Sequence, residues 1–264
     1  MVFDGKVFAA KIEEELKHEL VLMKKKPKLV ILRDEKSEAS RVYVGKKKEM
    51  GERIGIEMGL IEDTASALRA SPPNLGGDCD GVMVQLPLEG KNKEETEKLL
   101  RRIPLEKDVD CVNPDNLLAI ERGEETYLPA TVVAVEKIMG QALIETEVDL
   151  DTVKIAVVGS EGMVGKPLVA RLKRFGYEVG EFDLGSDLSK LVDFNLIISA
   201  VGKAGVISGE MISEGSILID VGFPKADFSG SALLKAQWYT PVPGGVGPVT
   251  VVCLMENVVK AAQN

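Results

Sequence analysis

The chain has 264 residues, of which 45% are hydrophobic and 28% charged, and its formal net charge is −9 at pH 7. This composition is typical of a globular protein and excludes a disordered chain, and the negative charge is unsuited to a nucleic-acid partner, which requires a basic surface. No run of about 18 apolar residues occurs that would predict a membrane-spanning helix.

The first half of the chain alternates apolar runs with helical periodicity. Continuous apolar runs such as KLVIL (28–32) and DGVMVQL (80–86) are typical of buried parallel strands, whereas apolar residues repeating every three or four positions indicate helices. In chain order these patterns predict a helix at 7–23, a strand at 28–32, a helix at 37–54 capped by Ser37, strands at 56–61 and 80–86, and helices at 93–102 and 131–139.

The second half repeats this alternation more clearly. Strands are predicted at 154–158, 178–182, 196–201 and 216–221, with a helix at 167–175 and a final apolar helix at 249–262. The rhythm predicts two α/β domains, the second a Rossmann-like, doubly wound parallel sheet, with a cleft between them. We place the boundary in the charged and irregular stretch 117–130, which gives a first domain of residues 1–120 plus 249–264 and a second of residues 121–248.

The cysteines and the histidine of the chain limit the kinds of metal site, disulfide and acid–base group that it can form. Cys79, Cys111 and Cys253 are odd in number and form no CxxC pair, so we expect reduced thiols in a cytoplasmic protein, not disulfides or a zinc site. The N-terminal segment reaches acidic residues at once and has no signal-peptide pattern. Because His18 is the one histidine, histidine-based triads and metal sites are excluded, and acid–base chemistry falls to Lys, Tyr, Asp or Glu.

The segment GSEGMVGKP (159–167) joins a predicted strand to a predicted helix. Its glycines permit a tight turn and bring a pyrophosphate close to the helix N-terminus. The spacing is GxxGxxG, not GxGxxG, so the strand–turn–helix context carries the interpretation, and a structural crossover without a nucleotide is the alternative. Asp183 ends the next strand, where a carboxylate binds the ribose 2′-hydroxyl of NAD and repels the 2′-phosphate of NADP.

Tyr43 and Lys47 are candidates for proton transfer. They are four residues apart on a predicted helix and therefore share a face. Burial, or the neighbouring Lys46 and Lys48, would lower the pKa of Lys47 for this role. The alternative is an ordinary surface lysine beside a packed tyrosine.

Two further polar sites are candidates for ligand binding. Gln85 closes a strand at the carboxyl end, where open α/β sheets bind ligands, although a capped strand end would have the same pattern. Asp108 and Asp110, two residues apart, could accept the N–H donors of an amino-heterocycle or be solvated turn carboxylates.

The segment TPVPGGVGPVT (240–250) combines three prolines with three glycines before the final helix. Proline removes conformational freedom and glycine admits positive φ, so the segment is a stiff loop with few side chains. It is either a rigid start to the helix, with Pro248 in the first turn, or a surface that holds backbone against a ligand.

Eight segments in sequence order carry a resemblance that covers nearly the whole chain: SRVYVGKKKEMGERIGI, DGVMVQLPLEG, PLEKDVD, PAT, VVGSEGMVGKP, SAVGKAG, ILIDVGF and TPVPGGVGPVT. They resemble the bifunctional methylenetetrahydrofolate dehydrogenase/methenyltetrahydrofolate cyclohydrolase (FolD) family. The resemblance implies NAD(P)-dependent oxidation of 5,10-methylenetetrahydrofolate to the methenyl form and its hydrolysis to 10-formyltetrahydrofolate. It also implies a cytoplasmic homodimer that binds tetrahydrofolate derivatives, with no metal, nucleic acid or membrane partner.

The resemblance also assigns residues. Lys47 would polarise the folate and shuttle protons in the cyclohydrolase step, Gln85 would tune that lysine, and Tyr43 would line the folate. Asp110 would anchor the pterin ring, and Gly247 and Pro248 would touch the folate. Residues at positions that contact the dinucleotide are Gly159, Ser160, Glu161, Gly165, Asp183, Phe223, Thr131 and Thr250.

The chain departs from the family pattern at several positions. Ser160 and Glu161 replace the usual Arg-Ser pair, and Asp183 replaces a common histidine; because both changes disfavour a 2′-phosphate, we expect weakened NADP selectivity, with NAD use, against the family's NADP default. Val132 replaces a proline, Cys111 stands where glycine is usual, and the segment after Phe223 looks shortened.

The alternatives are a dehydrogenase of another reduced pterin or of a shikimate-like acid, and a non-catalytic folate- or nucleotide-binding relative. The combination of Lys47, Gln85 and Asp110 argues against both.

Overall fold

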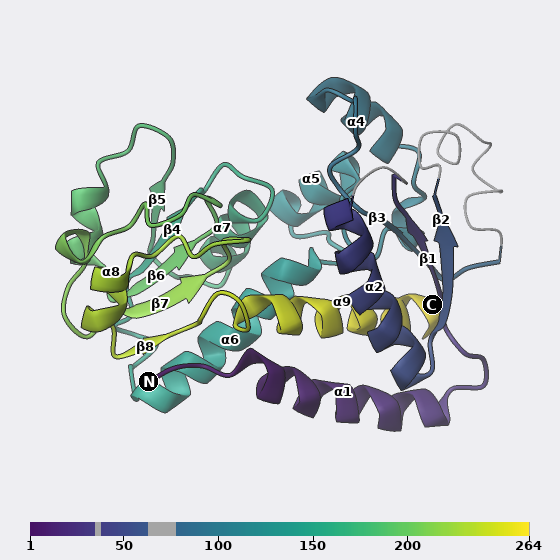
Figure 1. Cartoon of the computed structure of the whole chain (residues 1–264), viewed down its shortest axis with the longest axis horizontal. Helices are drawn as coiled ribbons and strands as arrows, with labels where there is room; N and C mark the ends of the chain where they lie inside the picture. The colour runs from purple at the N-terminus through teal and green to yellow at the C-terminus, as the bar shows by residue number, and fades with distance from the viewer. Residues whose placement is uncertain (35–37, 63–77, 264) are drawn as a thin grey trace. The chain divides into compact units, whose positions relative to one another are not determined.

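The computed structural model describes residues 1–34, 38–62 and 78–263 (Figure 1). The chain divides into two compact units, Met1–Ala9 with Thr131–Thr250 and Ala10–Ala130 with Val251–Asn264. The boundaries fall inside helices α1 (Gly5–Leu22) and α9 (Val246–Gln263), and next to the first residue of α6 (Ala130–Thr146). Each unit contains one parallel sheet.

The smaller sheet is built around the apolar run KLVIL. Strand β1 (Lys28–Leu32) lies between β2 (Glu57–Ile61) and β3 (Gly81–Val84), and both pairings are parallel. Leu29–Leu32 and all of β3 are buried, as expected of strands covered on both faces. We call this part of the molecule the three-stranded unit.

Helices surround this sheet. Helix α2 (Glu38–Ile54) packs on β2, and α4 (Lys93–Leu100), the 3₁₀ helix η2 (Leu105–Lys107) and α5 (Pro114–Arg122) follow β3. One face of the sheet contributes alternate residues of β1 and β3 to a core with Leu88, Leu100 and Ile103. The strand residues that alternate with these, among them Ile31 and Met83, lie on the other face of the sheet and are also buried.

The larger sheet has five parallel strands in the order β5-β4-β6-β7-β8 (Figure 1). The strands are β4 (Ile155–Val158), β5 (Val179–Phe182), β6 (Leu196–Ser199), β7 (Ile217–Asp220) and β8 (Trp238–Tyr239). The chain runs from β4 to β5 in one direction and continues with β6 on the other side of β4, so the winding reverses between β4 and β6. This reversal defines a doubly wound sheet.

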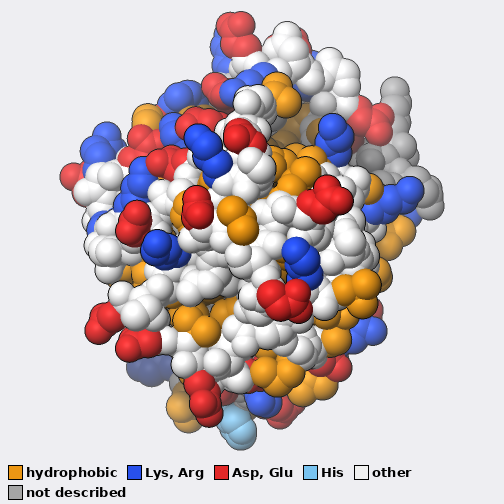
Figure 2. All heavy atoms as spheres, turned by 90° about the vertical axis from the view of Figure 1, so that its left-hand side faces the viewer, with side chains coloured by type: hydrophobic (Ala, Val, Ile, Leu, Met, Phe, Trp, Pro, Cys, Tyr) orange, Lys and Arg blue, Asp and Glu red, His pale blue; other side chains and the backbone are white. Residues whose placement is uncertain are grey.

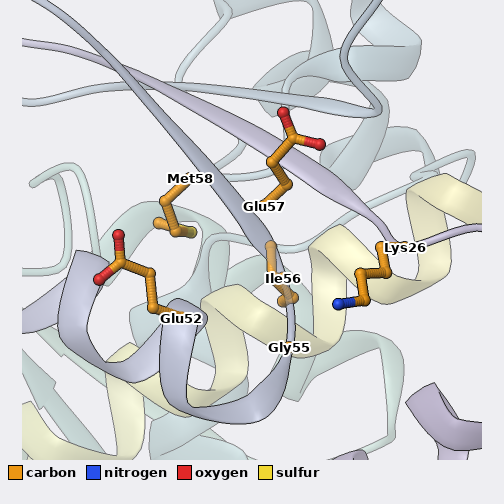
Figure 3. Close-up of a pocket in the computed structure, with 6 residues that line it drawn as sticks. All are labelled: Lys26, Glu52, Gly55, Ile56, Glu57 and Met58. Atoms are coloured by element: carbon orange, nitrogen blue, oxygen red, sulfur yellow. The ribbon is translucent and has the colours of Figure 1, made fainter.

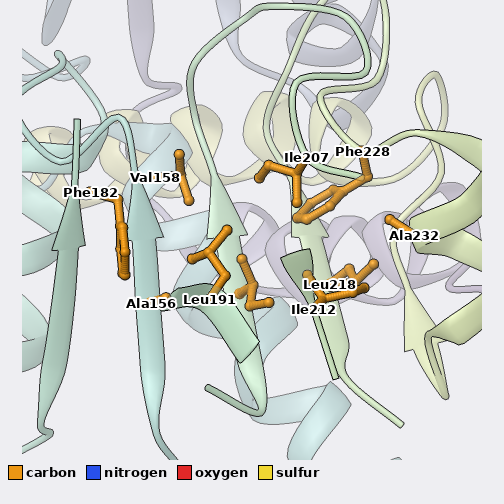
Figure 4. Packing of buried hydrophobic residues seen from close by; sticks show 10 residues of the cluster. Ala156, Val158, Phe182, Leu191, Ile207, Ile212, Leu218, Phe228 and Ala232 are labelled. Carbon is orange, nitrogen blue, oxygen red and sulfur yellow. The ribbon is translucent and has the colours of Figure 1, made fainter. Parts of the chain in front are cut away.

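Both faces of the five-stranded sheet are covered, and we call this part of the molecule the five-stranded unit. Helix α7 (Gly165–Arg174) packs on β4 and β5. Alternate strand residues, among them Ala156, Val158 and Leu218, pack against Leu191 of η3 (Leu188–Asp193), Ile212 after η4 (Gly209–Met211) and Ala232 of α8 (Gly230–Lys235) (Figure 4). All of these core residues are at most 3% exposed, so the sheet is rigid beneath its carboxyl ends.

The predicted α/β class and the doubly wound parallel sheet are confirmed, and every predicted strand forms within a few residues of its expected limits. The prediction that 117–130 is irregular was wrong in part. Helix α5 begins at Pro114 after the cap Asn113, whose side chain accepts from Asp115 N, and it ends at Gly123 in the left-handed conformation. These are ordinary start and stop signals that the charge of the segment concealed. Helix α8 and the short strand β8 were also not predicted, and Ser37 lies outside the described residues.

The surface mixes charges of both signs: on the face shown in Figure 2, Lys and Arg side chains are interspersed with Asp and Glu. Within residues 1–34, 38–62 and 78–263, no helix is both long and apolar enough to cross a membrane. The same part of the chain has no group of three or more His, Cys, Asp or Glu side chains placed to hold a metal ion. All three cysteines are buried, and none forms a disulfide.

Candidate active site

In the three-stranded unit the strands end level with one another. Leu32 pairs with both Ile61 and Val84, so the residues that follow all three strands emerge at one edge of the sheet. Gln85 follows β3 there, and its backbone N–H donates to Leu32 O at 2.8 Å. This is the edge at which parallel α/β sheets place ligand-binding groups.

Lys47 reaches this edge from α2. Its Nζ lies 3.1 Å from Gln85 Oε1 and 3.4 Å from Met83 Sδ. Met83 lies in β3 and Gln85 follows that strand two residues later, and the side chains of both contact Lys47 Nζ. Gln85 Nε2 donates to Leu86 O at 3.0 Å, which directs the amide oxygen at the lysine. Met83 was not predicted as a site residue, although its position two residues before Gln85 was a usable signal.

The surroundings of Lys47 make its ammonium group easier to deprotonate than that of an exposed lysine. Burial lowers the pKa of Lys47, and the charge of Asp110 opposes that shift. The neighbouring Lys46 and Lys48 are not among the causes, so burial and not like-charge repulsion produces the effect. Conversely, burial raises the pKa of Asp110 to about 6, with Lys47 acting to lower it. Lys47 and Asp110 are thus close enough to be coupled, and each moderates the shift of the other.

Asp108 and Asp110 have different surroundings. Asp108 is fully buried, and its carboxylate accepts from Val112 N (3.1 Å), Asn113 N (2.9 Å) and Asn116 Nδ2 (2.8 Å). Burial raises the pKa of Asp108. It therefore organises the turn that leads into α5, whereas Asp110 is only partly buried and is coupled to Lys47. The solvated-carboxylate alternative is wrong for Asp108.

Tyr43 lies one helical turn before Lys47 on α2 and is partly buried. Desolvation raises the pKa of its phenol, so it is a neutral hydroxyl at physiological pH. The predicted group Tyr43, Lys47, Gln85 and Asp110 thus belongs to one unit, and the last three are joined by hydrogen bonding or charge.

In the five-stranded unit the glycine-rich turn follows β4. Gly159 has φ +85°, and a Cβ on Gly165 would lie 2.0 Å from Gly159 O, so both positions require glycine. The N–H groups of Gly159 and Ser160 donate to Phe182 O at the end of β5 (2.8 and 3.1 Å). The turn is compact and opens directly into α7, the arrangement that binds a pyrophosphate at a helix N-terminus.

Asp183 lies beside this turn. Its Oδ2 accepts from Glu161 N at 2.7 Å and its Oδ1 from Leu184 N at 2.7 Å. These backbone hydrogen bonds lower the pKa of Asp183, so it is a carboxylate at neutral pH. The sites where a 2′-phosphate would be expected thus carry two acidic side chains, Glu161 and Asp183.

The other predicted ligand contacts lie elsewhere in the five-stranded unit. Phe223 follows β7 and is exposed, and Thr131 is the second residue of α6. Thr250 is in α9, with its hydroxyl donating to Val246 O at 3.2 Å. Gly247 and Pro248 form the first turn of α9, so the predicted rigid start to the final helix is confirmed. The roles of these five residues in ligand binding remain predictions.

A surface hollow of about 420 Å³ lies away from the Lys47 group (Figure 3). Its lining includes Lys26, Gly55 and Glu57, which precede or begin strands β1 and β2. It therefore lies at the amino ends of the strands, opposite the edge that carries Gln85.

The chain matches known proteins over its full length. The family model described as tetrahydrofolate dehydrogenase/cyclohydrolase, catalytic domain, matches residues 3–110, and that described as its NAD(P)-binding domain matches residues 129–264. The bifunctional protein FolD of Lactobacillus delbrueckii is 33% identical, over 98% of this chain and 96% of the relative.

Solved structures of the same family have the same fold as this chain. The FolD dehydrogenase/cyclohydrolase of Campylobacter jejuni is 31% identical, with a TM-score of 0.89 over 100% of this chain and 99% of its own. The FolD of Trypanosoma brucei, solved with NADP and an inhibitor, is 27% identical, with a TM-score of 0.87 over 100% and 97%. With two family models that together span most of the chain and relatives that match it from end to end, this chain belongs to the tetrahydrofolate dehydrogenase/cyclohydrolase family.

Proposed function

We propose that Lys47 is the proton-transfer group of a cyclohydrolase and that Gln85 and Asp110 hold it in its working state. The enzyme is bifunctional: it oxidises 5,10-methylenetetrahydrofolate to the methenyl form and hydrolyses that product to 10-formyltetrahydrofolate. The observation that carries the assignment is the Lys47 Nζ–Gln85 Oε1 contact of 3.1 Å at the ligand-binding edge of the sheet.

In the hydrolytic step, water adds to the methenyl carbon, the bond from that carbon to N5 breaks, and the formyl group stays on N10. N5 takes up one proton, and the second leaves through Lys47. Because burial lowers the pKa of Lys47, more of its side chain is neutral amine at neutral pH than in an exposed lysine, so an amine is available to accept that proton. Gln85 Oε1 then accepts a hydrogen bond from the ammonium form.

Asp110 would orient the substrate by accepting the N–H donors of the pterin ring, and Tyr43 would line the same site. Gly247 and Pro248 would present backbone to the folate. A carboxylate that receives two N–H groups binds an amino-heterocycle with defined orientation, which is what both reactions at the methylene carbon need.

The five-stranded unit fits a nicotinamide dinucleotide. A bound dinucleotide supplies the hydride acceptor for the oxidative step. Gly159, Ser160 and Gly165 would receive its pyrophosphate at the start of α7, in a turn whose close backbone packing requires glycine at 159 and 165. Thr131, Phe223 and Thr250 are proposed as further contacts.

We propose that the enzyme uses NAD in preference to NADP. Asp183 is a carboxylate at the end of β5, where it would hydrogen-bond the ribose hydroxyls of NAD. Glu161 adds a second negative charge to the same turn, which disfavours a 2′-phosphate.

We further propose that the three-stranded unit is the folate domain and the five-stranded unit the dinucleotide domain of a cytoplasmic homodimer. The bounds expected from the sequence, 1–120 with 249–264 and 121–248, differ from these units at residues 1–9, 121–130 and 249–250.

Replacement of Lys47 tests the assignment. Lys47→Ala should lower the rate of methenyltetrahydrofolate hydrolysis at least 100-fold while folate binding is retained. Lys47→Arg should be equally inactive, because a guanidinium keeps the charge but cannot exchange its proton. The hydrolysis is followed by the loss of methenyl absorbance.

Lys46→Ala is the matched control: it removes an exposed lysine from the same helix and should leave the rate within about twofold of wild type. Hydrolysis by Lys47→Ala at the wild-type rate would refute the proposal.

A further inference from the structure

A buried carboxylate outside every site described above supports the turn that follows β6. Asp227 has no exposed surface, and its Oδ2 accepts from Ser199 Oγ (2.8 Å), Val201 N (2.9 Å) and Gly202 N (3.2 Å). Three donors from four consecutive residues converge on one oxygen atom. The geometry of residues 199–202 is therefore set by a side chain that lies 25 or more positions later in the chain.

This turn adjoins the glycine-rich turn at the point where the winding of the sheet reverses. Strands β4 and β6 are neighbours there, and Ala200 N donates to Val158 O at 2.9 Å. A Cβ on Gly159 would lie 2.9 Å from Ala200 O and 3.4 Å from Val201 N. The two turns are thus in close contact at the carboxyl ends of β4 and β6, where doubly wound sheets bind their ligands.

A second carboxyl group restrains the same region from β7. Asp220 accepts from Gly222 N (2.8 Å) and Phe228 N (3.2 Å). A Cβ on Gly222 would lie 2.5 Å from Asp227 Oδ1 and 2.8 Å from Asp220 Oδ1, so only glycine leaves room for the pair. Burial, with a contribution from the charge of Asp227, raises the pKa of Asp220 to about 6.

Asp227 Oδ1 is buried and has no hydrogen-bond partner in the part of the chain that the structure describes. A buried acceptor without a hydrogen-bond partner costs free energy. Costly groups of this kind cluster at functional sites, which makes Asp227 a candidate for a functional role.

We propose that Asp227 is a positioning residue for the dehydrogenase reaction, which holds the turn 199–202 in the shape that receives the half of the dinucleotide opposite Asp183. The inference rests on the proposed function, in which the dinucleotide crosses the carboxyl ends of the sheet. With Asp183 at β5 on one side of the glycine-rich turn, the nicotinamide half extends to the β6 side, over residues 199–202.

The test compares full-length wild type with Asp227→Asn, Ser199→Ala and Asp187→Asn. Asp227→Asn should raise the KM and the calorimetric Kd for the dinucleotide at least tenfold, because the amide cannot accept from three donors as a carboxylate does. Cyclohydrolase activity, assayed without dinucleotide, should stay within about twofold. Ser199→Ala removes one of the three donors and should give a smaller rise in KM of about threefold.

Asp187→Asn is the control for loss of a carboxylate in the same unit. Asp187 is exposed and caps η3 through Ser189 N, so dinucleotide binding should not change. Wild-type dinucleotide affinity in Asp227→Asn would overturn the inference, as would a proportional loss of both activities with a lower Tm, which marks a merely structural role. If Asp227→Asn does not fold, Ser199→Ala decides by the same two readouts. A wild-type protein that binds neither NAD nor NADP would overturn the proposed function together with the inference, whereas equal binding by wild type and Asp227→Asn overturns the inference alone.

Discussion

Cys111 is, with Glu147, one of two non-glycine residues that have a positive φ in the described part of the chain (φ +53°). A residue with a Cβ in this conformation costs about 1–2 kcal/mol. Cys111 follows Asp110 directly and is buried, with its Sγ donating to Tyr127 O at 3.6 Å. The strained position therefore sets the direction of the backbone at Asp110.

Replacements at Cys111 should invert the usual order of stability. At an ordinary buried position Ala is more stable than Gly by about 0.5–1 kcal/mol. At Cys111 we expect the Gly variant to exceed the Ala variant by about 1 kcal/mol, because only glycine adopts positive φ without strain. Urea unfolding of both variants measures the difference.

Cys79 provides the matched pair. It is also buried and its φ is not positive, so Cys79→Ala should be more stable than Cys79→Gly. An Ala variant at Cys111 that matched or exceeded the Gly variant would contradict the strain argument.

The segment that joins η2 to α5 shows how an element places a functional group. The carboxylate of Asp108 accepts hydrogen bonds from the backbone N–H groups of Val112 and Asn113 and from the side-chain amide of Asn116. Asn113 in turn donates to Ile103 O at 3.0 Å and caps α5. Asp110 lies in the chain between Asp108 and Val112, and its carboxylate accepts a hydrogen bond from the backbone N–H of Ala130 at the start of α6. The turn, not Asp110 itself, decides where that carboxylate lies.

Removal of Asp108 should therefore affect both stability and substrate binding. Asp108→Ala leaves three buried donors without an acceptor, which should lower the free energy of unfolding by about 2–4 kcal/mol. The KM for methylenetetrahydrofolate should rise because Asp110 is no longer held in place. Asp108→Asn, which keeps one acceptor oxygen, should lie between wild type and Asp108→Ala in both measurements.

Asp115, in the first turn of α5, is the comparison. It is exposed and pairs with Arg101 at the surface, so Asp115→Ala should cost less than about 1 kcal/mol and leave the KM unchanged. A loss of the same size at Asp108 and Asp115 would be inconsistent with a network role for Asp108.

The whole molecule divides its chemistry between two units. Lys47, Gln85 and Asp110 belong to one, and the glycine-rich turn with Asp183 belongs to the other. Hydrolysis of methenyltetrahydrofolate needs no dinucleotide, so changes in the five-stranded unit should act on oxidation alone.

Cofactor selectivity should be reversible without loss of hydrolysis. Wild type should have a higher kcat/KM with NAD than with NADP. The variant Ser160→Arg, Glu161→Ser, Asp183→Ser supplies a cation and removes two negative charges, so its ratio of NADP to NAD kcat/KM should rise about 10- to 100-fold. The cyclohydrolase rate should stay within about twofold.

Glu178→Ser is the charge control. It removes an acidic side chain just before β5, at the opposite end from Asp183, and should leave the cofactor ratio unchanged. A strong NADP preference in the wild-type enzyme would overturn the selectivity proposal at once.

Strands and the glycine-rich turn could be predicted because their signals are local. Runs such as KLVIL and KIAVV are buried on both faces and so remain apolar throughout, and the turn needs glycine at 159 and 165 for reasons of backbone geometry alone. Helix α5 was missed although Asn113, Pro114 and Gly123 are local signals as well. The charged residues of this segment are typical of a loop as well as of an exposed helix, so composition alone does not separate the two.

By itself the sequence determined the α/β class and the order of the strands along the chain, because apolar runs and periodicity are local signals. Spacing together with the resemblance to the family made Tyr43, Lys47, Gln85 and Asp110 the candidate site residues. Only the tertiary structure decided that burial lowers the pKa of Lys47, that Asp108 supports the turn while Asp110 is coupled to the lysine, and that Asp227 holds the turn after β6. The physical reason is that desolvation and hydrogen bonding depend on atoms that are far apart in the chain, and folding alone brings them together.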